Sequence, residues 1–213
     1  MQIAVLIFDE LAALDAIGPY EVFRSVPGWE VKFVGPRKGE VRAESGFLGL
    51  HVDHSLDEVT ASDVLLVPGG KGNRPLMEDK EVLSWLRAVD AGTKWTTSVC
   101  TGSLLLGAAG LLEGKRATSH WALLERLRDF GAEPVRGRFV EDGKTITAAG
   151  VSAGIDMALH LVGREAGTEV AQAVQLGIEY DPQPPFDTGS PEKAPASIIE
   201  RVTGAVRRSA QTA

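Results

Sequence analysis

A direct switch from strand-like to helix-like sequence at residues 95–108 is the feature that most limits the folds open to this chain. Residues 95–99 are rich in β-forming side chains, and a small-residue helical pattern follows with almost no loop between, with Cys100 at the junction. Such a junction is typical of a strand that leads straight into a helix and holds one side chain at the tip of a sheet, beside unpaired backbone N–H groups. The pattern predicts an α/β fold with a strand–elbow–helix around Cys100.

Strand-like and helix-like segments alternate along the rest of the chain. Continuous apolar runs suit strands buried on both faces of a parallel sheet, and amphipathic runs suit the helices that cover it. The predicted strands are residues 3–8, 29–34, 63–67 and 95–99, and the predicted helices are 15–25, 74–91, 101–108, 120–130, 155–162 and 168–176. This alternation predicts a doubly wound, mostly parallel sheet flanked by helices, of the flavodoxin-like kind.

Proline and glycine positions add local detail. Pro19 is expected in the first turn of the first helix, and Asp142-Gly143 in a hairpin turn between two short strands. Residues 181–186 are rich in proline and predict an extended segment. A last helix is expected at 196–209.

Length and composition restrict the possible functions. With 213 residues and no repeat or linker, the sequence predicts a single domain over residues 1–213. A net charge of −7 argues against nucleic-acid binding, which needs a basic face. The first ten residues have no basic region and turn acidic after a short apolar run, so neither a signal peptide nor a membrane span is expected. Together with a single cysteine, this predicts a cytoplasmic protein.

Cys100 is the first candidate for chemistry. A thiol at a helix N-terminus is exposed to partial positive charge, which favours the thiolate and predicts a nucleophile. The alternative is a buried, inert cysteine, because free cysteine is among the most buried residue types.

Asp15 is the second candidate. It is a carboxylate inside the otherwise apolar run 11–19. A carboxyl group in an apolar cleft has a raised pKa and can deliver a proton near neutral pH. The alternative is a helix N-cap before Gly18-Pro19.

The turn Pro68-Gly69-Gly70 follows the 63–67 strand and ends at the same edge of the sheet as Cys100. The N–H groups of Gly69, Gly70 and Thr101 are predicted to stabilise negative charge that develops on a ligand, as an oxyanion hole does. The alternative is an ordinary strand–helix turn that uses glycine for its backbone freedom.

Histidines and cofactor motifs give weaker signals. His120 is a possible partner for a cysteine nucleophile, although a helix-start residue packed beside Trp121 is the simpler interpretation. His51 and His54 are a weak metal signal, for which solvent exposure is favoured. The chain has no phosphate loop, no His-Glu-x-x-His site and no dinucleotide fingerprint, so neither a cofactor nor a metal is expected.

Several of these segments together resemble a known family. The turn Val67-Pro68-Gly69-Gly70 and the segments 98–103, 107–112 and 114–121 resemble the ThiJ/PfpI superfamily, which is related in fold to class I glutamine amidotransferases. They are most similar to a branch that contains isonitrile hydratases and the amidotransferase-like domains of AraC-type regulators. Three further segments, 14–20, 150–156 and 175–186, are similar to the hydratases, and the last likeness continues to residues 190–197.

The resemblance implies an activity and a set of site residues. The activity is hydration of an isonitrile to an N-substituted formamide, without a cofactor, in a homodimer. Cys100 would form a thioimidate with the substrate, Asp15 would act as acid and base, and Thr101 would support the site. Gly150, Val151 and His120 would lie around the pocket.

The chain departs from other branches of the superfamily. Thr101 follows the cysteine where proteases commonly have histidine, and the carboxylate is Asp15 where they commonly have glutamate. A Cys-His peptidase is therefore not expected, and neither is a DNA-binding regulator, because no helix-turn-helix pattern follows residue 205. Two alternatives stay open: a glyoxalase- or deglycase-like enzyme on 2-oxoaldehydes, and a cysteine redox or stress sensor without turnover.

Overall fold

The structure is a computed structural model that describes the backbone of residues 1–211 and the side chains of residues 1–204. Its internal packing divides it into two units, Met1–Ile178 and the segment that begins at Glu179. The single domain predicted over 1–213 stays a prediction.

The first unit is built on a seven-stranded sheet in the order β10-β11-β7-β6-β1-β2-β5. All neighbours are parallel except β10 and β11, which form an antiparallel hairpin at one edge. The strands are β1 Gln2–Leu6, β2 Glu30–Gly35, β5 His54–Ser55, β6 Val64–Val67, β7 Trp95–Val99, β10 Phe139–Asp142 and β11 Thr145–Ala148. The predicted doubly wound, mostly parallel sheet is confirmed.

The central strands are buried on both faces, as their continuous apolar sequences predict. Every residue of β6 and β7 is buried, and so is every residue of β1 after Gln2. Leucine, isoleucine and valine side chains from these strands fill the core between the two layers of helices. This burial fixes the carboxyl ends of β1, β6 and β7 side by side, where the candidate site lies.

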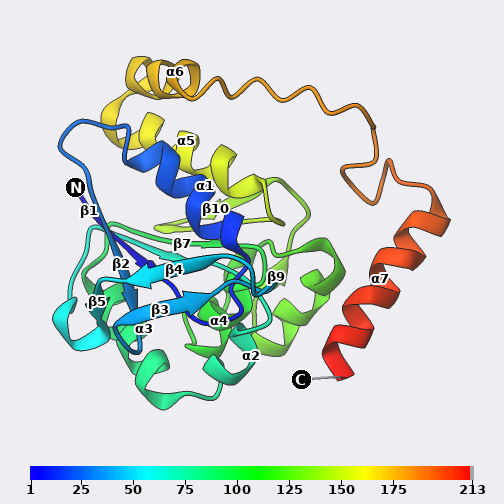
Figure 1. The fold of residues 1–213 in the computed structure, drawn as a ribbon, viewed down its shortest axis with the longest axis horizontal. Helices are drawn as coiled ribbons and strands as arrows, with labels where there is room; N and C mark the ends of the chain where they lie inside the picture. The colour runs from blue at the N-terminus through cyan, green and yellow to red at the C-terminus, as the bar shows by residue number, and fades with distance from the viewer. Residues whose placement is uncertain (212–213) are drawn as a thin grey trace. The chain divides into compact units, whose positions relative to one another are not determined.

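Helices cover both faces of the sheet. Helices α1 and α5 pack together on one side, and α3 and α4 lie on the other (Figure 1). The helices of this unit are α1 Ala13–Phe23, α2 Asn73–Leu76, α3 Lys80–Gly92, α4 Gly102–Ala108, α5 Ala153–Ala166 and α6 Thr168–Gly177, with 3-10 segments η1 Leu56–Glu58 and η2 Trp121–Phe130.

The position predicted for Pro19 is wrong. Helix α1 begins at Ala13, directly after the extended residue Ala12, so Pro19 lies inside the helix and not in its first turn. A methyl group added at Gly154 of α5 would lie only 3.0 Å from Pro19 Cγ. The proline ring therefore packs closely against α5, which favours it at this position over its cost in the helix.

Short strands and turns complete the first unit. Strands β3 Gly39–Arg42 and β4 Gly49–Val52 form a hairpin, and β8 Arg116–Ala117 pairs with β9 Glu133–Pro134. The predicted hairpin turn after Asp142 is confirmed, because Asp142 pairs with Thr145 and Gly143 has a left-handed φ of 62°.

The described part of the second unit, which ends at residue 211, contains one helix. Turns and bends without a strand run from Glu179 to Pro195, and α7 Ala196–Gln211 follows. The last helix predicted from the sequence is confirmed, and the extended segment at 181–186 stays a prediction.

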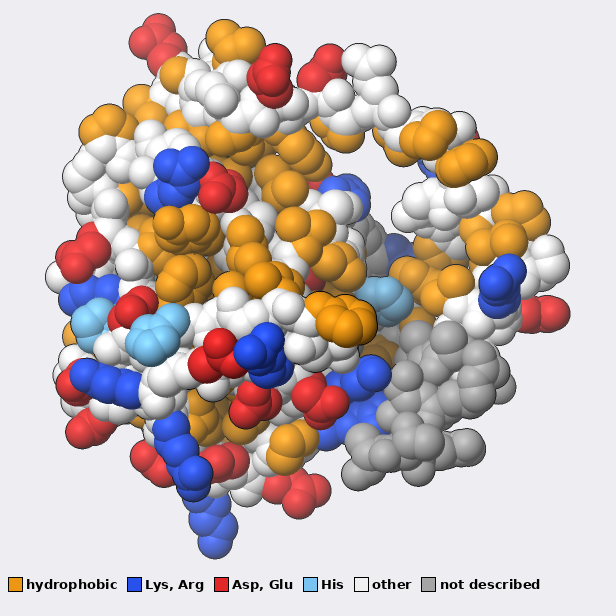
Figure 2. Space-filling model, in the orientation of Figure 1, with side chains coloured by type: hydrophobic (Ala, Val, Ile, Leu, Met, Phe, Trp, Pro, Cys, Tyr) orange, Lys and Arg blue, Asp and Glu red, His pale blue; other side chains and the backbone are white. Residues whose placement is uncertain are grey.

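Two surface observations bear on partners. In the described part of the chain, no helix has both the length and the apolar sequence needed to span a bilayer. On the face shown in Figure 2, acidic and basic side chains are interspersed rather than gathered by sign.

Candidate active site

Cys100 lies between β7 and α4 in a strained backbone conformation. Its φ is 58°, in the left-handed region that residues other than glycine rarely adopt. Its N–H donates to the carbonyls of Ala148 and Ala149, both at 3.0 Å, and its carbonyl accepts from Ser103 Oγ at 3.1 Å and Ser119 Oγ at 3.0 Å. These four bonds hold the strained residue in place, and strain of this kind is concentrated at functional sites.

Asp15 lies in the first turn of α1 with a fully buried side chain. Ala12 holds the N-cap position, so the alternative that Asp15 caps the helix is wrong. Asp15 Oδ2 accepts a hydrogen bond of 2.8 Å from the Gly69 N–H. Its other oxygen, Oδ1, is buried and has no hydrogen-bond partner of ordinary geometry within the described residues. One carboxyl oxygen is thus anchored, and the other is left for chemistry.

Burial raises the pKa of Asp15 from 3.8 to about 7. The Gly69 N–H opposes this shift, the negative charge of Glu44 adds to it, and the Cys100 thiol lowers it slightly. The carboxyl group is therefore poised to hold or release a proton near neutral pH.

The pKa of the Cys100 thiol is also raised. Its residue is 7% exposed, and burial, followed by the negative charge of Asp15, raises the thiol pKa well above its ordinary value. The Thr101 backbone and hydroxyl oppose this shift. The expectation that the helix N-terminus makes the Cys100 thiol a thiolate is wrong, because α4 spans only seven residues and desolvation outweighs its effect. The Cys100 thiol becomes a thiolate here only when a neighbouring group accepts the thiol proton.

The turn after β6 brings these groups together. A methyl group added at Gly69 would lie 2.7 Å from Thr101 N and 2.8 Å from Asp15 Oδ2, so only glycine lets the turn approach so closely. The Gly69 N–H donates to Asp15, and the Gly70 N–H donates to Thr101 Oγ1 at 3.0 Å. Both amides therefore position side chains of the site. This corrects the expectation that they are free to donate to a ligand as an oxyanion hole.

Sequence reasoning missed Asn73, the first residue of α2. Its side chain is 2% exposed, and Nδ2 donates to Pro68 O and to Thr101 Oγ1, both at 3.3 Å. It also missed Ser119, which bonds the Cys100 carbonyl, and Glu44, whose charge acts on the pair. An asparagine close after a glycine turn was the available signal, but its contact with Thr101 depends on how α2 packs.

His120 follows Ser119, and Gly150 and Val151 follow Ala149; Ser119 and Ala149 both hydrogen-bond the Cys100 backbone. His120 is the N-cap of η2: its Nδ1 accepts from the Ala122 N–H at 3.3 Å, and its ring lies 5.6 Å from the Trp121 ring. The interpretation of His120 as a helix-start residue beside Trp121 is confirmed. Burial lowers the pKa of His120. A methyl group at Gly150 would lie 2.4 Å from His120 Cδ2, and Val151 is 36% exposed. Their roles in a pocket stay predictions.

The other histidines lie elsewhere. His51 is exposed and His54 is half-buried. Among the described residues, no three histidine, cysteine or acidic side chains are grouped so that they could hold a metal ion.

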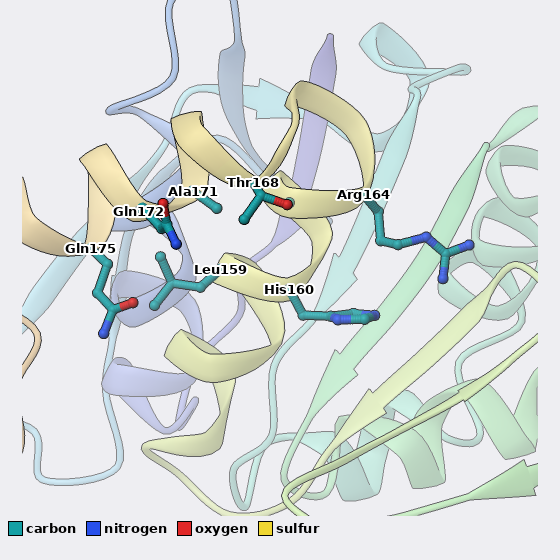
Figure 3. A pocket seen from close by; sticks show the side chains of 8 residues that line it. Leu159, His160, Arg164, Thr168, Ala171, Gln172 and Gln175 are labelled. Atoms are coloured by element: carbon teal, nitrogen blue, oxygen red, sulfur yellow. The ribbon is translucent and has the colours of Figure 1, made fainter.

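A surface hollow of about 360 Å³ lies between α5 and α6 (Figure 3). It is formed by Leu159, His160, Gly163, Arg164, Thr168, Ala171, Gln172 and Gln175. None of the predicted site residues contributes to it. The candidate active site is instead the buried cluster at the carboxyl ends of β1, β6 and β7.

Comparisons with known proteins identify the family of the chain. Residues 1–164 match the model of the DJ-1/PfpI family. The isonitrile hydratase of Pseudomonas putida is 46% identical over 200 residues, which cover 94% of this chain and 87% of that protein. The transcriptional regulator GbdR of Pseudomonas aeruginosa is 34% identical over 82% of this chain, which spans 48% of the regulator.

A solved structure extends the likeness to three dimensions. The crystal structure of a ThiJ/PfpI family protein from Pseudomonas syringae has a TM-score of 0.94 and 38% identity, over 97% of this chain and 86% of that one. The resemblance seen in the sequence is therefore confirmed, and the chain belongs to the DJ-1/PfpI family.

Proposed function

We propose that this protein is an isonitrile hydratase that converts R–N≡C and water to R–NH–CHO. The observation that carries the proposal is the buried pair of Asp15 and Cys100, in which a proton-holding carboxyl adjoins a neutral thiol. The extensive likeness to a named isonitrile hydratase supports the choice of substrate.

In the first half of the reaction, the pair adds across the isonitrile carbon. The thiol proton passes by way of Asp15 to the terminal carbon, and the Cys100 sulfur bonds to the same carbon. The product is the thioimidate R–N=CH–S–Cys100. Because the carbon receives the proton and the sulfur together, no free thiolate has to persist in the buried site.

In the second half, water hydrolyses the thioimidate. Asp15, which ends the first half protonated as it began, gives its proton to the imine nitrogen and takes one from water as the water oxygen bonds to the carbon. The C–S bond then breaks, and the sulfur takes the remaining water proton by way of Asp15. The formamide leaves, and the pair returns to its starting state.

Thr101 supports both halves. Its N–H and hydroxyl favour negative charge on the Cys100 sulfur, and they stabilise that sulfur as it attacks and as it leaves. We further propose that the protein is cytoplasmic and acts as a homodimer on a small-molecule substrate. Light scattering of the purified protein tests the homodimer.

The test follows formamide formation from cyclohexyl isonitrile by the wild type and by Cys100→Ala and Asp15→Asn. We expect no product from Cys100→Ala and a loss of about 10²–10⁴-fold for Asp15→Asn, the range for removal of a general acid–base. The exposed Asp53 provides a matched control, Asp53→Asn, that keeps wild-type activity.

Product from Cys100→Ala at the wild-type rate would refute the mechanism. Folded wild type that yields no formamide would refute the proposed substrate. Methylglyoxal turnover and intact mass after dilute peroxide would then distinguish 2-oxoaldehyde chemistry from a thiol sensor.

A further inference from the structure

Asn73 has a buried amide whose orientation the surrounding groups determine. Its Nδ2 lies 3.3 Å from Pro68 O and 3.3 Å from Thr101 Oγ1. A carbonyl oxygen can only accept, so the end of the amide near Pro68 must be the NH₂ group. The second hydrogen of that group is then donated to Thr101.

Thr101 Oγ1 therefore receives two hydrogen bonds. One comes from Asn73 Nδ2 and the other from the Gly70 N–H at 3.0 Å. A hydroxyl oxygen has two lone pairs, so both are occupied and the hydroxyl hydrogen must be donated elsewhere. Thr101 directly follows Cys100 in the chain, and its hydroxyl lowers the pKa of the Cys100 thiol against the effect of burial.

The side-chain oxygen of Asn73 makes no hydrogen bond that would explain an asparagine at this position. Asn73 Oδ1 is buried and lacks a hydrogen-bond partner in the part of the chain that the structure describes. An unpaired buried carbonyl destabilises a fold, and an apolar side chain of similar shape would avoid that loss. The NH₂ group of Asn73 makes both of the hydrogen bonds of this side chain, so its donors are what asparagine contributes here.

We propose that Asn73 is a positioning residue: together with the Gly70 amide, it fixes the Thr101 hydroxyl as a hydrogen-bond donor to the Cys100 sulfur. The catalytic consequence rests on the proposed function. A donor locked toward the sulfur stabilises it as thiolate during attack and again as leaving group. Without Asn73, the hydroxyl can rotate and accept from the sulfur side instead.

The test is a double-mutant cycle read out on the thiol itself. Cys100 is the only cysteine, so alkylation by iodoacetamide and the ultraviolet absorbance of the thiolate both report on it alone. Asn73→Leu removes the donors at similar size, and Thr101→Val removes the hydroxyl at similar shape. We expect Asn73→Leu to slow alkylation at pH 7 roughly tenfold and to raise the apparent thiol pKa, as loss of a hydrogen bond to a charged group predicts.

The cycle separates positioning from a general structural effect. In the Thr101→Val background, Asn73→Leu should have no further effect. In the Thr101→Ser background, which keeps a hydroxyl, its effect should persist. An equal effect of Asn73→Leu in all three backgrounds, or wild-type reactivity of the single variant, would overturn the proposal. Asn73→Ala replaces Asn73→Leu in the cycle if thermal melting shows that the leucine variant does not fold.

A measurement of enzyme activity distinguishes failure of the proposed hydratase function from failure of the proposed role of Asn73. With cyclohexyl isonitrile, Asn73→Leu should lower kcat about tenfold and leave KM unchanged, because the hydroxyl acts on the sulfur and not on the bound substrate. If the wild type forms no formamide but the alkylation cycle shows the coupling, the proposed function fails and the role of Asn73 stands.

Discussion

Two carboxylates in this molecule have opposite surroundings. Asp15 is fully buried, and its polar partners are the neutral Gly69 amide and the Cys100 thiol. Glu141 on β10 is about a quarter exposed and lies 2.7 Å from His160 Nε2 and 2.6 Å from an Arg164 nitrogen, both on α5.

The contrast shows how the surroundings of a carboxylate decide whether it serves catalysis or a surface ion pair. A buried carboxylate without a cation avoids its desolvation cost by holding a proton, and so becomes an acid. A carboxylate that is about a quarter exposed and lies beside an arginine forms a solvated ion pair, which adds little to stability. The difference therefore lies in solvent access and counter-charge.

The largest effect that tests this contrast is the pH dependence of stability for Asp15→Asn. Between about pH 4 and 7, the folded protein holds a proton on Asp15 that the unfolded chain has released. The contribution of Asp15 to the stability of the wild type thus falls as pH rises through this window, by about 1.4 kcal/mol per pH unit and about 4 kcal/mol in all. Asparagine does not titrate, so the variant should gain on the wild type by that amount, as measured by urea unfolding at each pH.

A difference between Asp15→Asn and wild type that does not change with pH would contradict a buried, proton-holding Asp15. Asp53→Asn is the matched control, because water surrounds this exposed aspartate in both states. Above pH 7 the gain should level off, since Asp15 is then ionised in both the folded and the unfolded wild type.

The next effect tests how tightly the buried cluster is built. A methyl group at Gly102 would lie 2.0 Å from the Val67 carbonyl oxygen, a backbone atom that cannot move aside. Gly102→Ala should therefore destabilise the protein by about 1–3 kcal/mol and separate β6 from α4. Gly92→Ala is the control, because the space around Gly92 is open. Equal stability of the two variants in thermal melts would contradict this close approach.

Much of the fold could be predicted from the sequence, for a physical reason. Strands such as Val64–Val67 are buried on both faces, so their sequences are continuously apolar and easily recognised. The junction at Cys100 was also recognisable, because strand and helix meet there without a loop. Pro19 was misplaced because its packing against Gly154 is a tertiary contact that overrides the usual position of proline.

The sequence allowed the residues of the candidate site to be predicted, but not the hydrogen bonds between them. Residue type marked Asp15 and Cys100 as reactive. The partners of Gly69 and Gly70 could not be foreseen, because those amides could equally face a ligand or a side chain of the protein. The same holds for Asn73, whose contact with Thr101 joins the start of α2 to the start of α4, 28 positions apart in the chain.

A smaller effect is expected at the surface carboxylate. Glu141→Gln removes the charge but keeps an oxygen near His160 and Arg164. Because this cluster is solvated, unfolding free energy should fall by about 0.5–1 kcal/mol, and formamide formation should not change. A loss of several kcal/mol in urea unfolding would show that the Glu141 pair behaves as a buried one, and the contrast with Asp15 would fail.

The smallest effect links the surface to the buried pair. Glu44 is exposed, and its carboxylate is held in place by a 2.8 Å hydrogen bond from the Lys71 N–H. Burial is the main cause of the raised pKa of both Asp15 and Cys100, and the negative charge of Glu44 adds a smaller contribution to each. Glu44→Gln keeps an oxygen for Lys71 and should lower both pKa values, which speeds alkylation of Cys100 at neutral pH roughly twofold, as a screened charge predicts.

Salt provides the decisive comparison for Glu44. Added salt screens a charge that acts through solvent, so the difference between Glu44→Gln and wild type should shrink at about 1 M salt. Glu40→Gln, on the same hairpin, is the matched control and should leave alkylation unchanged. An equal response of the two variants would mean that general surface charge and not the fixed position of Glu44 acts on the thiol. A response of Glu44→Gln alone would show that an exposed carboxylate tunes the buried pair, so that solvent access does not by itself separate surface structure from chemistry.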